Sequence, residues 1–163
     1  MASVLGQSPP TSECGRGARM PLRDVLLDPA KSDAVVADCC TLVDEEVAAK
    51  SGLSGFAVKA GYAAVKGIKP GFIREVVNKL LPEFSDKLDP LWTEAKGTGN
   101  ASKHLADQRG RVADALLSVT DGKINSAKSS LVRGTYEKLR GSAKKNVEEA
   151  VPRLARLLDK HAA

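Results

Sequence analysis

Seven basic side chains between residues 123 and 145 form the feature of this sequence best suited to binding chemistry. Only one acidic residue, Glu137, accompanies them, so the segment has a net charge of +6. On a helix, Arg133, Arg140 and Lys144 fall within about 40° of one another, while Lys138 and Lys145 lie further round. The segment is therefore an anion-binding candidate for nucleic acid phosphates or anionic lipid. The alternative is a solvated face that partly neutralises the acidic residues 21–52, whose net charge is −4 (three basic, seven acidic).

The connector Lys66-Gly67-Ile68-Lys69-Pro70-Gly71 is a secondary anion-binding candidate through Lys66 and Lys69. Glycines let a ligand approach the backbone, and the N-terminus of a following helix attracts anions. The spacing of the two glycines and the absence of a Gly-Lys-Ser/Thr ending exclude a nucleotide phosphate loop. A turn between two helices explains the same residues.

Catalytic and metal-binding patterns are missing from the sequence. His104 and His161 stand 57 positions apart with no other histidine or cysteine beside them, so no zinc-ligand spacing occurs. Acidic residues gather near residues 38–46 and at positions 148 and 149, and nothing in the sequence brings the two groups together. We therefore predict no catalytic residues, no metal and no cofactor. An enzyme whose site is assembled from lysines and carboxylates stays open as a lesser alternative.

Composition narrows the class of protein further. The chain has 163 residues and a net charge of +5, is 42% hydrophobic and only 4% aromatic, and has no apolar run long enough for a membrane span. A core built from Leu, Val and Ala is typical of packed helices. The three cysteines, two of them adjacent, do not form a disulfide framework. We therefore expect an intracellular, cytoplasmic protein.

Apolar periodicity predicts an all-α bundle of about six to eight helices, several of them short. The clearest helices are expected over residues 32–50, 53–67 and 73–84, and through the last third of the chain. Pro82 and Pro90 are expected to divide the region after residue 81 into short pieces. Gly141 and Pro152 are expected to bend or divide the last helix. The loop at residues 97–100 is the clearest in the chain.

The first twenty residues have turn chemistry without apolar periodicity and are expected to form a disordered tail. A single helical domain is expected over residues 21–163. Because Met20 opens the patterned segment, it is a candidate for the natural start, which would make the tail a start-site extension. An N-terminal peptide containing Ala2 in native protein would exclude that start.

Small residues crowd one part of the second predicted helix, at Ala57, Ala60, Gly61, Ala63 and Ala64. A glycine inside a helix costs about 1 kcal/mol relative to alanine, so close approach of another helix is the expected compensation. The same residues suggest an interaction surface. The favoured function is a non-enzymatic module that binds or scaffolds another protein, through self-association or otherwise. The rival is the anion-binding surface of residues 123–145.

Several phrases together resemble a family of small, soluble, uncharacterised bacterial proteins predicted to be all-helical. They are DCCTLVDEEV (38–47), GLSGFAVKAGYAAVKGIKPGF (52–72), KLLPEF (79–84), ALLSVTD (115–121) and YEKLRGSAKKNVEEAVPRLARLLDKH (136–161). The resemblance covers about residues 21–162 and leaves out the tail. It implies an intact helical domain of bacterial, cytoplasmic origin, and it implies no catalytic residue, cofactor or partner.

Overall fold

The structure is a computed structural model that describes residues 19–163; the expected tail therefore lies almost wholly outside the described residues. Seven helices make up this part of the chain, and the described residues contain no strand, so the all-α prediction is confirmed. The helices are α1 (Leu22–Leu26), α2 (Ser32–Ala49), α3 (Gly52–Lys66), α4 (Phe72–Gly97), α5 (Ala101–Asp107), α6 (Arg109–Ile124) and α7 (Ser130–Ala162).

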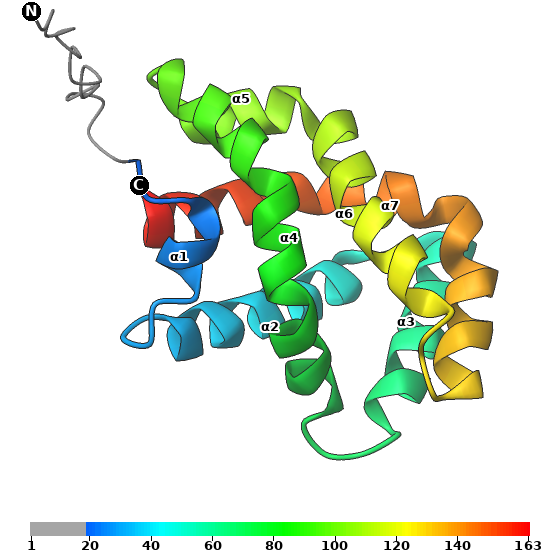
Figure 1. Ribbon diagram of the computed structural model, residues 1–163. Coiled ribbons are helices and arrows are strands. Elements are labelled where there is room, and N and C mark those ends of the chain that lie inside the picture. Colours follow the sequence, from blue (N-terminus) through cyan, green and yellow to red (C-terminus); the bar gives the residue numbers. More distant parts are fainter. Residues whose placement is uncertain (1–18) are drawn as a thin grey trace, which may run out of the picture.

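Two long helices, α4 and α7, organise the bundle (Figure 1). α4 packs against α1, α2, α3, α5 and α6, and α7 packs against α1, α2, α3, α5 and α6. The C-terminal end of α7 lies beside α1, so the two ends of the described chain meet at one side of the molecule (Figure 1).

The buried core includes residues near both ends of the described chain, among them Leu22 and Ala162. It is built from aliphatic side chains of six helices around Trp92, as expected for a chain with few aromatics. Leu22, Val35, Leu105 and Leu158 are each no more than 1% exposed. α3 contributes no side chain to this core, and its only buried residue is Gly55. Residues 130–150 of α7, against which α3 lies, also contain no buried residue.

Pro82 and Pro90 do not divide α4, so that prediction was wrong. A proline inside a helix leaves the carbonyl four residues earlier without its donor. Those carbonyls belong to Asn78 and Asp86, which are both exposed and can bind water instead. The apolar side of α4 keeps its period across both prolines and supplies Leu81, Leu88, Leu91 and Trp92 to the core.

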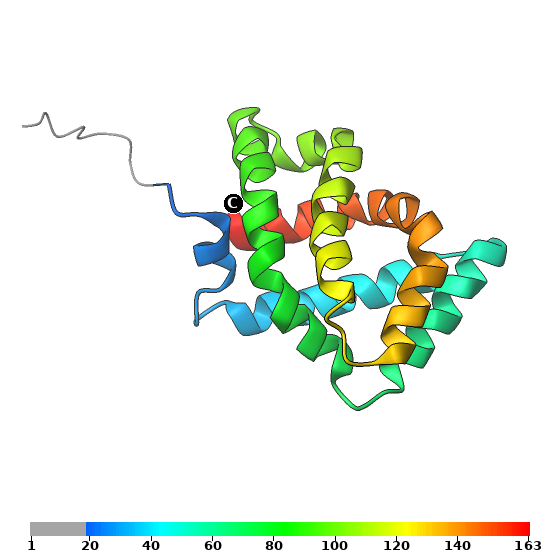
Figure 2. The ribbon, with the colours of Figure 1, turned by 45° about the vertical axis from the view of Figure 1, so that its right-hand side comes forward.

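Three other local predictions concern the last helix, the connector 66–71 and the loop 97–100. α7 stays one helix through Gly141 and Pro152, but its ribbon turns sharply within its orange part, so it is bent rather than divided (Figure 2). α2 begins at Ser32, and in the turn before it the Asp28 carboxylate accepts the Ala30 N–H at 2.8 Å. The connector ends at Gly71, which lies in the left-handed region, and α4 starts at Phe72. The connector 66–71 and the loop 97–100 lie between helices as expected.

Arg19, one residue before the expected start at Met20, contacts the folded part of the chain. Its guanidinium pairs with Asp89 on α4 at 2.6 Å. The same carboxylate accepts the backbone N–H of Leu22 at 2.8 Å, which fixes the beginning of α1. A chain that began at Met20 would keep the second contact and lose the first.

Gly61 lies where α3 and α7 approach each other closely. A Cβ atom at this position would lie 2.8 Å from Thr135 Cγ2 and 3.2 Å from Leu139 Cδ1. The predicted compensation for a glycine inside a helix is thus confirmed at Gly61, where α3 and the first half of α7 run side by side (Figure 2).

Gly61→Val should therefore separate α3 from α7. We expect the free energy of unfolding to fall by about 1–3 kcal/mol, because overpacking forces neighbouring groups apart. Gly134→Ala is the matched control, since nothing lies within 4 Å of a Cβ atom there. It should raise stability by about 0.5–1 kcal/mol through helix propensity. Urea unfolding measures both, and equal effects would contradict close packing at Gly61.

Candidate interaction surface

One side of α3 is apolar and open to solvent along the whole helix. At 100° per residue its members fall within an arc of about 120°. All are exposed and none is charged; we call this set the outer face of α3, and it comprises Leu53, Phe56, Ala57, Ala60, Ala63 and Ala64. Leu53 is 93% exposed and Phe56 is 73% exposed. Large apolar side chains this exposed and this close together are typical of binding surfaces.

The opposite side of α3 is fixed to the rest of the molecule. The Tyr62 hydroxyl donates a hydrogen bond of 2.5 Å to Asp44 on α2, and Lys66 Nζ lies 3.3 Å from the same carboxylate. Gly55 lies against the backbone of Lys50, where a Cβ atom would be 2.8 Å from the carbonyl carbon. These contacts and Gly61 hold the orientation of α3, so its outer face points away from the bundle.

Several basic side chains of the predicted anion-binding segment make ion pairs or hydrogen bonds within the protein. Arg140 makes two hydrogen bonds of 2.9 Å to Asp121 on α6. Lys144 pairs with Asp114, also on α6, at 3.1 Å. Arg133 donates to the Ala127 carbonyl, which closes the connection before α7.

The remaining predicted basic residues divide into two groups. Lys66 and Lys69 pair with Asp44 and Glu75, the latter at 2.5 Å, so both lysines of the connector have acidic partners. Lys138 and Lys145 are exposed and have no ion-pair partner among residues 19–163. Lys123 pairs with Glu83 at 2.5 Å, and Lys128, just before α7, is exposed with no ion-pair partner among the same residues. The structure thus leaves Lys128, Lys138 and Lys145 as the free part of the predicted surface.

Acidic residues that are far apart in the sequence meet at Lys50, which the sequence did not predict. Lys50 Nζ lies 2.5 Å from Glu149 and 3.6 Å from Glu46, and its side chain is only 10% exposed. Arg153 contacts Glu46 at 2.6 Å. The hydrogen bond from Lys50 lowers the pKa of Glu149. Lys50 and Arg153 thus stand between the two carboxylates and join α2 to α7, whereas carboxyl groups that work as an acid–base pair share one site directly.

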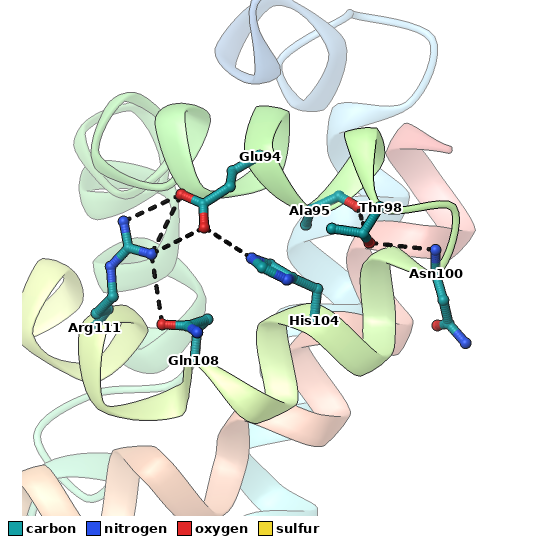
Figure 3. Close-up of polar contacts among 7 residues, drawn as sticks. All are labelled: Glu94, Ala95, Thr98, Asn100, His104, Gln108 and Arg111. Carbon is teal, nitrogen blue, oxygen red and sulfur yellow. Dashed lines mark hydrogen bonds and ion pairs between the residues drawn. The ribbon is translucent and has the colours of Figure 1, made fainter.

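The two histidines occupy separate ion-paired clusters. His104 and Arg111 both contact Glu94, at 2.9 and 3.1 Å, which ties the end of α4 to α5 and α6 (Figure 3). Hydrogen bonds from Arg111 first, and then from His104, lower the pKa of Glu94. His161, near the end of α7, contacts Asp38 on α2 at 2.7 Å. Each histidine thus bridges helices through one carboxylate.

Asp38→Asn tests the contribution of the second cluster to stability. Hydrogen bonds from Lys160, and then from His161, lower the pKa of Asp38. Its carboxylate therefore stabilises the fold above the unfolded value, about 3.9, and this contribution is lost as pH falls through the lowered folded pKa. The difference in unfolding free energy between the two proteins should be largest at pH 7 and shrink toward pH 3.

Urea unfolding at several pH values measures that difference. Glu137→Gln is the matched control, because Glu137 is exposed on α7 and makes no ion pair within the described part of the chain. Its difference from wild type should stay small at every pH. A difference for Asp38→Asn that grows toward acid pH would contradict the assigned role of the pair.

The cysteines of α2 are packing residues. Burial raises the pKa of Cys39 to about 12, and burial also raises the pKa of Cys40. Thiols in such surroundings stay protonated at neutral pH and are poor nucleophiles.

Cys40 borders a shallow recess of about 170 Å³ with Tyr62 and Arg74, and a second recess of about 220 Å³ lies between α2 and α7 beside Arg153.

Residues 19–163 contain no group of three or more His, Cys, Asp or Glu side chains placed to hold a metal ion. No helix among them is both long and apolar enough to span a membrane.

No curated protein and no solved structure matches the chain. A family model does match, over residues 22–162, and it confirms the resemblance to an all-helical family without a known activity. The chain belongs to that family, the Family of unknown function (DUF6918).

Proposed function

We propose that this protein is a non-enzymatic helical module that binds another protein chain through the outer face of α3. The observation that carries the proposal is the exposure of Leu53 and Phe56, 93% and 73%, on a helix held in place by its opposite side. An apolar stripe of this kind binds in the groove or against the helix of a partner. The ordered position of α3 also reduces the entropy cost of binding.

The charged clusters support an interaction role over a chemical one. Lys50, Arg140 and Lys144 each contact carboxylates of a neighbouring helix, as do His104 and His161. These contacts stabilise the arrangement of helices. The outer face of α3 has no such internal partner. Association with another protein would remove its apolar surface from water, which is favourable.

The rival proposal is binding of nucleic acid or an anionic membrane by the basic side of α7. Its support is Lys138 and Lys145, together with Lys128 just before the helix, which carry no ion pair among the described residues. So few phosphate contacts give little affinity, and that affinity falls as salt is added. The two proposals therefore differ in their response to ionic strength.

Affinity capture from native lysate at about 0.15 M and 0.5 M salt tests the proposal. We expect Leu53→Glu/Phe56→Glu to remove the captured proteins at both salt concentrations, because an apolar contact resists screening. Met20→Glu is the matched control; Met20 is 61% exposed and comes just before α1, and Figure 1 shows α1 and α3 at opposite sides of the molecule. It should leave capture unchanged.

Two results would contradict the proposal. Capture that survives Leu53→Glu/Phe56→Glu would place the binding surface elsewhere. Capture that disappears at high salt and with Lys138→Glu/Lys145→Glu would favour the anionic-surface rival.

A further inference from the structure

The outer face of α3 is complementary in shape to itself. Its large side chains, Leu53 and Phe56, stand in the N-terminal half, and only small residues follow in the C-terminal half. Ala60 lies between the halves. Counting outward from Ala60 in both directions pairs Phe56 with Ala64 and Leu53 with Gly67, so each large side chain corresponds to a small residue.

From this arrangement we propose that the partner of α3 is α3 of a second copy, packed antiparallel with Ala60 at the two-fold axis. The inference rests on the proposed function and names its partner. In an antiparallel pair, Phe56 of one copy lies over Ala64 of the other, and the same contact repeats by symmetry. A parallel pair would instead place Phe56 against Phe56 and leave a gap between the alanines.

Ala60 at the centre allows the helices to approach closely. Small residues at a helix contact give the shortest interaxial distances, near 8 Å. A pair of helices at this distance lets each Phe56 ring reach the partner's backbone near Ala63 and Ala64. Leu53 lies one turn further out and covers Gly67, the C-cap of the partner helix.

The response to added salt distinguishes this dimer from binding to an anionic surface. Lys59 borders the outer face, is exposed and has no ion-pair partner among residues 19–163. The two-fold axis places the Lys59 residues of both copies along the same edge of the pair. Because like charges repel, added salt should leave the dimer unchanged or strengthen it, whereas binding to lipid or nucleic acid weakens with salt.

One helix from each copy makes a smaller interface than the roughly 800 Å² per partner of a standard complex, so we expect a reversible dimer. Sedimentation equilibrium of the full chain at concentrations from about 1 to 300 µM, in two salt concentrations, measures its dissociation constant. Phe56→Glu should weaken dimerisation at least tenfold, and Met20→Glu should leave it unchanged.

A second substitution tests the antiparallel register. In Phe56→Glu/Ala64→Lys, the carboxylate introduced at position 56 faces the ammonium group introduced at position 64 of the other copy, and these two positions are about 12 Å apart within one helix. Opposite charges across the interface should restore dimerisation to within about threefold of wild type. Circular dichroism confirms that each variant is folded, which is expected because both positions are exposed.

Four other outcomes would overturn the proposed antiparallel dimer. A chain that stays monomeric at every concentration overturns it, yet leaves the proposed function standing if captured proteins still depend on the outer face. A dimer insensitive to Phe56→Glu forms through another surface. Failure of Ala64→Lys to restore the dimer excludes the antiparallel register. Phe56-dependent sedimentation with vesicles containing about 30% phosphatidylserine, by a monomeric chain, assigns the face to membranes instead.

Discussion

Trp92→Ala should lower the free energy of unfolding by about 3–5 kcal/mol, which is a large share of the stability of a domain this size. Trp92 is the single tryptophan of the chain and is 3% exposed. It lies on α4 within the core that also contains Leu22 and Leu158. Removing the indole leaves a cavity at the place where the helices meet.

Trp92→Phe is the conservative control, because a phenyl ring fills part of the same space. Its effect should be about half as large or less. Circular dichroism in urea is the measurement, since both variants lose the fluorescent side chain. Equal losses in the two variants would show that a specific contact of the indole matters more than the filled volume.

Amide hydrogen exchange should differ by a factor on the order of 10² between α3 and the C-terminal part of α7. α3 contributes no side chain to the core, whereas Val151, Ala155 and Leu158 of α7 are each at most 1% exposed. α3 can therefore open by breaking its contacts with Asp44 and Thr135 while the core stays intact.

Exchange is measured by mass spectrometry on the dilute chain, where any dimer has dissociated. Fast exchange in α3 with protection of residues 151–158 is the expected pattern. Equal protection of the two segments would mean that α3 unfolds only with the whole molecule, and would contradict its place outside the core.

Much of the fold was predictable because apolar periodicity records which side of a helix is buried. Val36 in the predicted helix 32–50 and Leu81 in the predicted helix 73–84 are both core residues. Pro82 and Pro90 misled the prediction, since a proline breaks a helix only when the freed carbonyl cannot be solvated. Whether Asn78 and Asp86 would be exposed depends on tertiary packing.

The candidate surface was predicted only in part. α3 is apolar on two sides, with Val58 and Val65 on one and Leu53 and Phe56 on the other. Periodicity alone cannot say which side of such a helix is covered. Gly61 indicated a close neighbour correctly, but the alanines around it are exposed to solvent.

The cross-helix ion pairs were beyond the sequence for a different reason. Lys50 and Glu149 are separated by 99 positions, and no local rule joins them. Asp121 and Asp114 of α6 likewise pair with Arg140 and Lys144 only because α6 packs along α7. A sequence shows how many charged residues a segment has. The fold determines how many of them form ion pairs within the protein and how many remain available to bind a partner.

The central claim is that the outer face of α3 is a surface kept for binding and takes no part in the core. The free energy of unfolding of Leu53→Glu/Phe56→Glu, measured in urea at a concentration that keeps the chain monomeric, tests it most directly. We expect a value within about 0.5 kcal/mol of wild type, as for other exposed positions. A loss of more than about 2 kcal/mol would show that Leu53 and Phe56 hold the fold together, and the claim would be wrong.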